Sequence, residues 1–144
     1  MPYLYKYPRP ALTVDAVVFK KVDKDISVLL IQRKNAPYRG KWALPGGFVD
    51  MDETLEESVY RELQEETGIT RVDLKQLHTF SSIERDPRGR TVSVVFWGIL
   101  QSGETPQAGD DAALAQWFNL NNLPPLAFDH KEILLMASKI INKK

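Results

Sequence analysis

The sequence contains no cysteine, and neither sign of charge is in excess. The absence of cysteine excludes disulfides, thiolate nucleophiles and cysteine-based zinc or iron–sulfur sites, and it fits a reducing compartment. Lysine and arginine total 19, as do aspartate and glutamate, so no general field attracts long nucleic acids. We therefore expect no nucleic-acid partner, local phosphate binding, and chemistry carried by carboxylates, hydroxyls, histidine or metal ions.

Long apolar runs and a secretion signal are also lacking. No apolar stretch approaches the roughly 18 residues that would cross a bilayer. The first twenty residues scatter Lys, Arg and Pro among apolar residues, without the ordered regions of a signal peptide. We expect a cytoplasmic protein with no membrane partner. A length of 144 residues suits one core better than two, so residues 1–144 are predicted to form a single domain.

Hydrophobic patterning predicts an α/β fold in which hairpins outnumber helices. Two pairs of apolar, β-branched runs are each joined by a turn and predict two hairpins. A stretch rich in Pro and Gly separates the first hairpin from the first helix. The sheet should be mixed, with helices on its faces. The predicted strands are 13–20, 26–33, 42–44, 74–84, 91–100 and 115–120, and the predicted helices are 55–67 and one that Asp129 caps.

The first predicted helix has clear end signals and an anomaly between them. Thr54 and Glu57 fit a capping box, and Gly68 is placed to end the helix in a left-handed conformation. At about 100° per residue, Glu62 and Glu66 fall on or beside the apolar stripe that should be buried. An ionised carboxylate that leaves water without a partner is costly, so a cation must compensate there.

Three carboxylates in this helix stand at relative positions i, i+3 and i+4. Glu62, Glu65 and Glu66 would give hard oxygen ligands within one turn, the kind of site that holds Mg²⁺ or Mn²⁺. The alternative is a solvated face held by salt bridges, because Glu57 with Arg61 and Arg61 with Glu65 are opposite charges four positions apart.

The surrounding sequence favours the metal site. Residues 47–69 read GFVDMDETLEESVYRELQEETGI, which resembles the Nudix signature at every fixed position. A match of this many residue types at fixed spacing rarely occurs by chance. The resemblance implies the Nudix fold, an α/β/α sandwich with a mixed β-sheet. It also implies a hydrolase that needs Mg²⁺ or Mn²⁺ and cuts a diphosphate linkage attached to a nucleoside.

The resemblance also implies roles for individual residues. The general base in this family is a glutamate of the signature or an acidic loop residue; the loop candidates are Asp110, Asp111 and Glu104, of which we favour Asp111. The metal ligands would be Glu62, Glu65 and Glu66, with Glu66 or Glu62 nearest the catalytic ion, and the carbonyl of Gly46 just before the signature would be a further ligand. Glu53 would be the carboxylate that orients the water or its metal shell. Arg61 would be the arginine that holds the glutamates in place.

Outside the signature, YPRPALTVDAVVF, LLIQRKNAPYRGKWALPGGFV and ERDPRGR resemble the ADP-ribose pyrophosphatase branch, which implies hydrolysis of ADP-ribose to AMP and ribose 5-phosphate. Each substrate-binding candidate has a structural alternative, either a surface arginine or a core aromatic, and burial is the favoured role for Trp42. No ligand spacing links His78 and His130, which we interpret as structural or surface residues. The candidates are Arg33, Arg85, Arg88 and Arg90 for phosphate or ribose, and Tyr38 and Phe48 for the base.

Two other functions remain open. One is a pyrophosphohydrolase of nucleoside triphosphates or dinucleoside polyphosphates. The other is a non-catalytic nucleotide-sensing module, because Phe128-Asp129-His130 resembles the junction in Nudix regulators that sense ADP-ribose derivatives. Those regulators add a winged-helix domain, for which this chain leaves no room, and its glutamates are intact, so we favour an enzyme. A homodimer is also expected, since residues 1–10 carry aromatic side chains without an obvious local partner.

Overall fold

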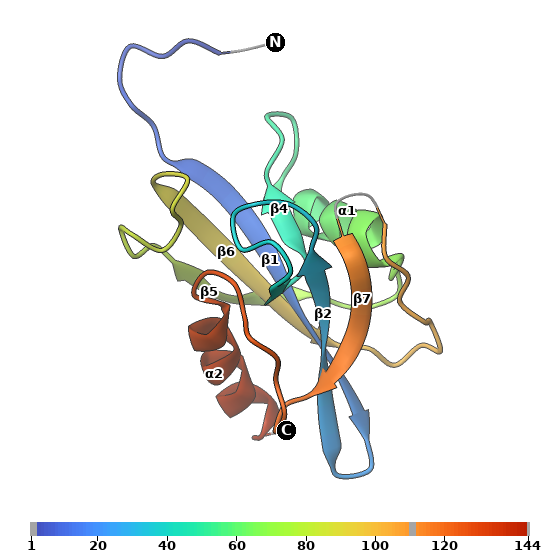
Figure 1. Ribbon diagram of the computed structural model, residues 1–144. Helices are drawn as coiled ribbons and strands as arrows, with labels where there is room; N and C mark the ends of the chain where they lie inside the picture. The colour runs from blue at the N-terminus through green and yellow to red at the C-terminus, as the bar shows by residue number, and fades with distance from the viewer. Residues whose placement is uncertain (1–2, 110–111, 144) are drawn as a thin grey trace.

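The computed structural model describes residues 3–109 and 112–143. The strands of these residues form one β-sheet, which lies between the two helices (Figure 1). The elements are β1 Ala11–Val22, β2 Asp25–Arg33, β3 Trp42–Ala43, β4 Gly46–Phe48, α1 Leu55–Thr67, β5 Lys75–Phe80, β6 Thr91–Ile99, β7 Ala112–Asn119 and α2 His130–Ile141. The strand order is β3-β2-β1-β6-β5, with β4 paired to β1 and β7 paired to β2. β1 is parallel to β6 and antiparallel to β2, so the sheet is mixed, as predicted.

Strand β1 is buried on both faces and determines the layers. Val14, Ala16 and Val18 belong to the apolar cluster that includes the inner face of α1, whereas Val17 and Phe19 belong to the cluster that includes the inner face of α2. This alternation follows from the strand geometry, in which successive side chains point to opposite faces. The two helices therefore cover opposite faces of the sheet, which confirms the predicted α/β/α sandwich (Figure 1).

The end signals of α1 are confirmed. The Thr54 hydroxyl accepts a hydrogen bond from the Glu57 amide at 3.1 Å, and the Glu57 carboxylate accepts one from the Thr54 amide at 2.9 Å. Gly68 adopts φ 76°, a left-handed conformation that costs glycine little, and donates to the Gln64 carbonyl. These caps fix where the helix begins and ends, and so fix which residues face the sheet.

The strand predicted over 74–84 is shorter than expected, because β5 ends at Phe80. The loop that follows buries Arg85 and Asp86. The Arg85 guanidinium donates two hydrogen bonds, of 2.8 and 2.7 Å, to the Asp129 carboxylate at the start of α2. This ion pair links the loop to α2.

The prediction that Asp129 caps α2 is correct in position and wrong in contact. Asp129 is the residue before the first turn, but its side chain makes no capping hydrogen bond, because the carboxylate is engaged by Arg85. Neither helix of the described residues has the length and apolar character needed to cross a membrane.

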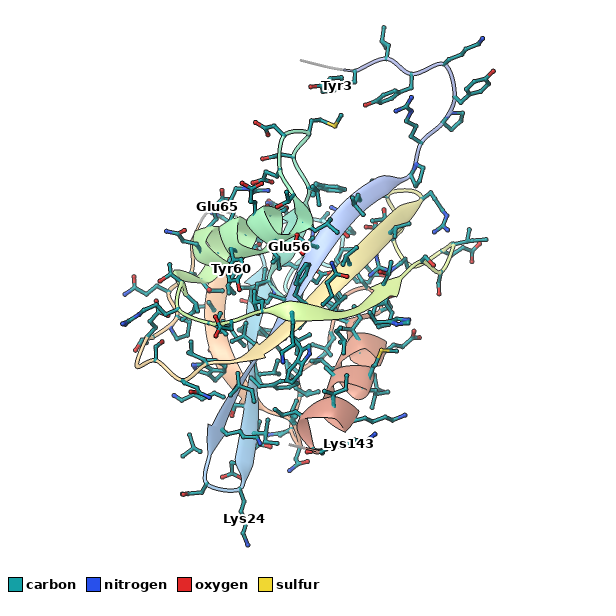
Figure 2. All side chains as sticks on the ribbon, turned by 180° about the vertical axis from the view of Figure 1, so that it is seen from behind. Tyr3, Lys24, Glu56, Tyr60, Glu65 and Lys143 are labelled. Carbon is teal, nitrogen blue, oxygen red and sulfur yellow. The ribbon has the colours of Figure 1, made fainter. Side chains whose placement is uncertain are left out.

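The segment before β1 extends away from the sheet (Figures 1 and 2). Its side chains are exposed, with Leu4 97% accessible, and the Tyr3 ring stacks on Tyr5 at a centroid distance of 6.3 Å. The expected homodimer stays a prediction, for which this exposed apolar segment is the motivation.

We expect Leu63→Ala to lower the free energy of unfolding by about 2–5 kcal/mol, because Leu63 is fully buried between α1 and the sheet and its removal leaves a cavity. Urea denaturation measures the change. The matched control is Leu135→Ala on the exposed side of α2, where 58% of the residue is accessible. Equal losses for both variants would contradict the packing described here.

Candidate functional site

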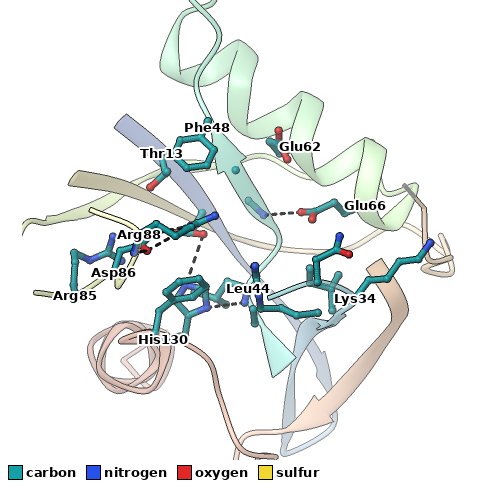
Figure 3. A pocket seen from close by; sticks show the side chains of 18 of the residues that line it. Thr13, Lys34, Leu44, Phe48, Glu62, Glu66, Arg85, Asp86, Arg88 and His130 are labelled. Carbon is teal, nitrogen blue, oxygen red and sulfur yellow. Dashed lines mark hydrogen bonds and ion pairs between the residues drawn. The ribbon is translucent and has the colours of Figure 1, made fainter. Parts of the chain in front are cut away.

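A pocket of about 470 Å³ opens between α1, strands β1, β2 and β4, the loop before β6 and the start of α2 (Figure 3). This volume lies within the range of small-molecule sites, roughly 300–1,000 Å³. Elements that are distant in sequence meet here because the sheet places β1 beside both β4 and β6. Of the residues predicted from the sequence, the pocket lining includes Arg33, Gly46, Phe48, Glu62, Glu66, Arg85 and Arg88.

Two carboxylates of α1 point toward β4 at one side of the pocket (Figure 3). Glu66 is only 8% exposed, and its Oε1 accepts a hydrogen bond of 2.8 Å from the Gly46 amide. Glu62 lies against Gly47, so closely that a Cβ on Gly47 would come within 2.6 Å of its carboxylate carbon. Burial raises the pKa of Glu62 above its ordinary value, although Arg61 opposes this effect. The helix thus presents two partly desolvated carboxylates to one cavity.

Arg61 connects three of the four signature glutamates. It donates to Glu53 at 2.5 and 2.9 Å, to Glu62 at 2.7 Å and to Glu65 at 3.2 Å. The hydrogen bond from Arg61 is the main reason that the pKa of Glu53 is lowered, and the same carboxylate raises the pKa of Arg61. These contacts supply the geometry that the expected holding role of Arg61 requires; the role itself stays a prediction.

The donor chemistry of the signature fits a divalent cation. Glu62, Glu66 and the Gly46 backbone all reach the pocket and offer hard oxygen donors, the ligands that Mg²⁺ and Mn²⁺ prefer. Within the described chain, no three acidic or histidine side chains converge on one point. The reason is local, because Arg61 engages Glu62 and Glu65, while Glu66 bonds to Gly46. Glu65, which the sequence suggested as a ligand, does not line the pocket.

Other predicted residues also lie outside the pocket lining, among them Glu53, Arg61, Tyr38 and Arg90. The Tyr38 ring packs on the Phe128 ring with 4.9 Å between the ring centroids, and Arg90 donates to the Ser81 carbonyl at 2.8 Å. Glu53 faces Arg61 rather than the cavity.

The candidate bases on the loop before β7 are placed only in part. Asp110 and Asp111 lie outside the described residues. The Glu104 carboxylate accepts hydrogen bonds from the backbone amides of Thr70 and Arg71, which lower its pKa to about 2. Since Glu104 is not part of the pocket lining, the geometry does not support it as the base.

Cations and aromatic rings gather at the pocket. The Arg88 guanidinium lies 5.0 Å from the Phe48 ring and 5.3 Å from the Phe128 ring, and Asp86 accepts from it at 2.8 Å. The Arg33 guanidinium lies 5.0 Å from the centroid of the same Phe128 ring. Two guanidinium groups beside aromatic faces suit a ligand that combines phosphates with a base.

Sequence reasoning missed the polar floor of the pocket. Asp15, Ser93 and His130 are buried, and Asp15 and His130 line the cavity. Asp15 carried a signal that could have been used, because it is a charged residue inside the apolar run TVDAVVF. No such signal marked His130. The structure buries this residue, so of its two interpretations, structural and surface, the surface one is wrong.

The adjacent glycines Gly46 and Gly47 should fail differently when changed to alanine. A Cβ on Gly46 would fall on the backbone of Val14 and Asp15, which cannot yield without moving β1, so we expect about 1–3 kcal/mol of destabilisation or more. A Cβ on Gly47 would meet only the flexible end of Glu62. Displacing that carboxylate by about 1 Å should lower the expected diphosphate-hydrolysing activity on the order of 10²-fold, with little loss of stability. Urea denaturation and kinetics together check this; the reverse pattern would contradict it.

Comparison with known proteins identifies a family and two kinds of relative. The model of the NUDIX domain matches residues 9–136. An ADP-ribose pyrophosphatase of Methanocaldococcus jannaschii is 50% identical over 128 residues, which cover 89% of this chain and 73% of that protein. The ADPR-responsive transcriptional repressor NtrR of Acinetobacter baylyi is 37% identical over 96% of this chain, but the match spans only 57% of the repressor.

Solved structures agree with these matches. A MutT/nudix family protein from Enterococcus faecalis superposes with a TM-score of 0.89 at 38% identity, over 99% of this chain and 66% of that one. The NUDIX domain of Shewanella oneidensis NrtR, crystallised with ADP-ribose, has a TM-score of 0.88 at 37% identity, over 94% and 90% of the two chains. NrtR has also been crystallised with a 27mer DNA, a structure of which this chain spans 63%.

Proposed function

The chain belongs to the Nudix family of pyrophosphohydrolases, and on this premise we propose that it hydrolyses the diphosphate of ADP-ribose to AMP and ribose 5-phosphate. The observation that carries the proposal is one pocket that holds Glu62 and Glu66 on one side and Arg33 and Arg88 beside aromatic rings on the other. The pyrophosphatase and the ADP-ribose complex among its relatives support the same substrate class.

Charge explains why the reaction needs a divalent ion. A diphosphate brings negative charge toward Glu62 and Glu66, a combination that is unfavourable without a cation between them. Nudix ADP-ribose pyrophosphatases in general depend on divalent metals, and Glu62, Glu66 and the Gly46 carbonyl, with Glu65 after release from Arg61, would hold Mg²⁺ or Mn²⁺ here. The ion supplies charge neutralisation and a water of lowered pKa.

The protein's own groups orient the substrate. Arg33 and Arg88 line the pocket, and their permanent positive charges attract phosphate oxygens; Asp86 accepts from Arg88 Nε and Nη2 and so holds this guanidinium at the pocket. Phe48 is 46% exposed at the pocket and offers a face on which the adenine base can stack. Among the candidates for the general base we retain Asp111, from the loop that follows β6 in the sequence.

A substrate panel tests the proposal. The purified protein is incubated with Mg²⁺, with Mn²⁺ or with a chelator, and with ADP-ribose, other nucleoside diphosphate sugars, nucleoside triphosphates and dinucleoside polyphosphates. We expect kcat/KM to be highest for ADP-ribose and turnover to stop with the chelator. Turnover of triphosphates alone would refute the substrate while retaining the reaction type.

A second candidate function is ADP-ribose sensing without turnover. It is favoured by the 37% identity to a transcriptional repressor and by the structural match to the NrtR complex with DNA. The expectation that the chain has no nucleic-acid partner therefore stays a proposal. Tight binding of ADP-ribose with no product, in the same panel, would favour sensing over hydrolysis.

A further inference from the structure

Two buried polar side chains, Asp15 and His130, line the floor of the pocket, and a third, Ser93, hydrogen-bonds to Asp15. Asp15 of β1 is 7% exposed, His130 of α2 is 4% exposed and Ser93 of β6 is fully buried. None of them belongs to the signature helix. Buried polar groups are costly unless they are hydrogen-bonded, so their contacts indicate what the floor is built to bind.

The hydrogen bonds of His130 fix which of its nitrogens carries the proton. The backbone amide of Leu44 donates to Nδ1 at 3.0 Å, so Nδ1 is an acceptor and bears no hydrogen (Figure 3). Burial lowers the pKa of His130, which favours the neutral ring. In the neutral ring the hydrogen is then on Nε2, which faces Asp15.

Asp15 presents one oxygen to the same space. Its Oδ2 accepts from the Ser93 hydroxyl at 2.5 Å, which holds the carboxylate in place. Its Oδ1 lies 3.9 Å from His130 Nε2, too far for a direct hydrogen bond. A donor and an acceptor thus face each other across a gap at the wall of the cavity.

The chemistry of the gap selects its occupant. A single oxygen atom can lie about 2.8 Å from both Nε2 and Oδ1, since hydrogen bonds of that length span a separation of 3.9 Å. This atom must accept from Nε2–H and donate to the carboxylate at once, which the hydroxyl of a ligand does, and which a water molecule does when no ligand is bound. A phosphate oxygen has no hydrogen to donate and would be repelled by the carboxylate.

We propose that the gap between Asp15 and His130 binds one hydroxyl of a substrate ribose, and that it is a specificity site for sugar-bearing diphosphates. The inference rests on the proposed function for the identity of the substrate. Its place supports it, because Asp15 packs against Gly46, whose amide bonds to the signature carboxylate Glu66. The gap is therefore close to where the diphosphate would react, and each ribose is directly attached to that diphosphate.

An ion pair joins the start of α2 to the loop before β6. Asp129, next to His130, forms the ion pair with Arg85, whose side chain is 4% exposed. Arg85, predicted from the sequence to bind phosphate or ribose, has two of its donor groups occupied in this way. We interpret Arg85 as a positioning residue for His130.

The test removes the hydroxyl and its partner separately and together. kcat/KM is measured for ADP-ribose and for analogues in which one ribose hydroxyl at a time is replaced by hydrogen, with the wild type and with Asp15→Asn. For one analogue, we expect the wild type to lose on the order of 10- to 100-fold, as for a hydrogen bond to a charged group. The same analogue should lose less than about 3-fold in Asp15→Asn, because the charged partner is already gone.

The controls keep the outcome interpretable. Asp23→Asn makes the same change in the exposed turn between β1 and β2, where a positive φ suits asparagine, and should leave the analogue's loss as in the wild type. His130→Gln, whose amide can accept from Leu44 and donate into the gap, should retain part of the loss. Should Asp15→Asn not fold, the wild type is compared with His130→Gln, and losses that are no smaller in His130→Gln than in the wild type for every analogue would overturn the inference.

Losses that are the same in the wild type and in Asp15→Asn for every analogue would overturn the inference. Failure of the proposed function is distinct, because it appears as absent turnover of ADP-ribose. In that case the same analogues are measured as ligands by calorimetry, and the same coupling is expected in the dissociation constants. Absence of both turnover and binding refutes both proposals.

Discussion

Glu66→Gln is expected to lower kcat/KM for ADP-ribose on the order of 10³-fold while the protein stays folded. Glutamine keeps the size of the side chain, and its carbonyl can still accept from the Gly46 amide. It lacks the negative charge that holds a divalent ion, whose stabilisation of transition-state charge amounts to several kcal/mol, at about 1.4 kcal/mol for each tenfold in rate. Initial rates of AMP formation measure the loss.

The matched control is Glu56→Gln, which makes the same change on the exposed side of the first turn of α1. It should retain the activity of the wild type. Both variants should unfold in urea close to the wild type. Activity of Glu66→Gln within a few-fold of the wild type would show that this carboxylate does not serve the reaction.

Arg61→Gln should lower kcat/KM on the order of 10²-fold. The guanidinium connects Glu53, Glu62 and Glu65, and a neutral amide cannot satisfy three carboxylates from one position. Without it the carboxylates repel one another, and displacement of Glu62 by about 1 Å suffices for a loss of this size. The steady-state kinetics are measured at saturating Mg²⁺, so that weaker metal binding does not limit the rate.

Arg71→Gln is the control for this change, because Arg71 follows the end of α1 and is exposed. It should be fully active. If Arg61→Gln were as active as Arg71→Gln, the contacts of Arg61 would have no part in positioning the glutamates.

Local signals explain what could be predicted. The capping box at Thr54, the left-handed Gly68 and the period of the apolar residues depend on neighbours in the sequence, so they define α1 before any tertiary contact is known. The same period placed Glu62 and Glu66 toward the sheet, where the structure has them.

Long-range contacts explain what could not. Asp15 and Ser93 are 78 positions apart, and Leu44 and His130 are 86 apart, so only the pairing of β1 with β6 and the docking of α2 bring them together. For the same reason the predicted strand 74–84 ran past Phe80, where β5 ends, because the local pattern could not show that Arg85 pairs with Asp129. The orientation of the Glu53 side chain could not be predicted either, because several carboxylates lie near Arg61 in the sequence and the pattern does not show which of them it contacts.

The most direct test of the central claim follows ADP-ribose in one sample by both binding and turnover. The wild type is mixed with ADP-ribose first with a chelator and then with excess Mg²⁺, and the products are separated by chromatography. The account predicts no products before Mg²⁺ is added and equimolar AMP and ribose 5-phosphate afterwards. Bound but intact ADP-ribose in the presence of Mg²⁺ and of Mn²⁺ would contradict it.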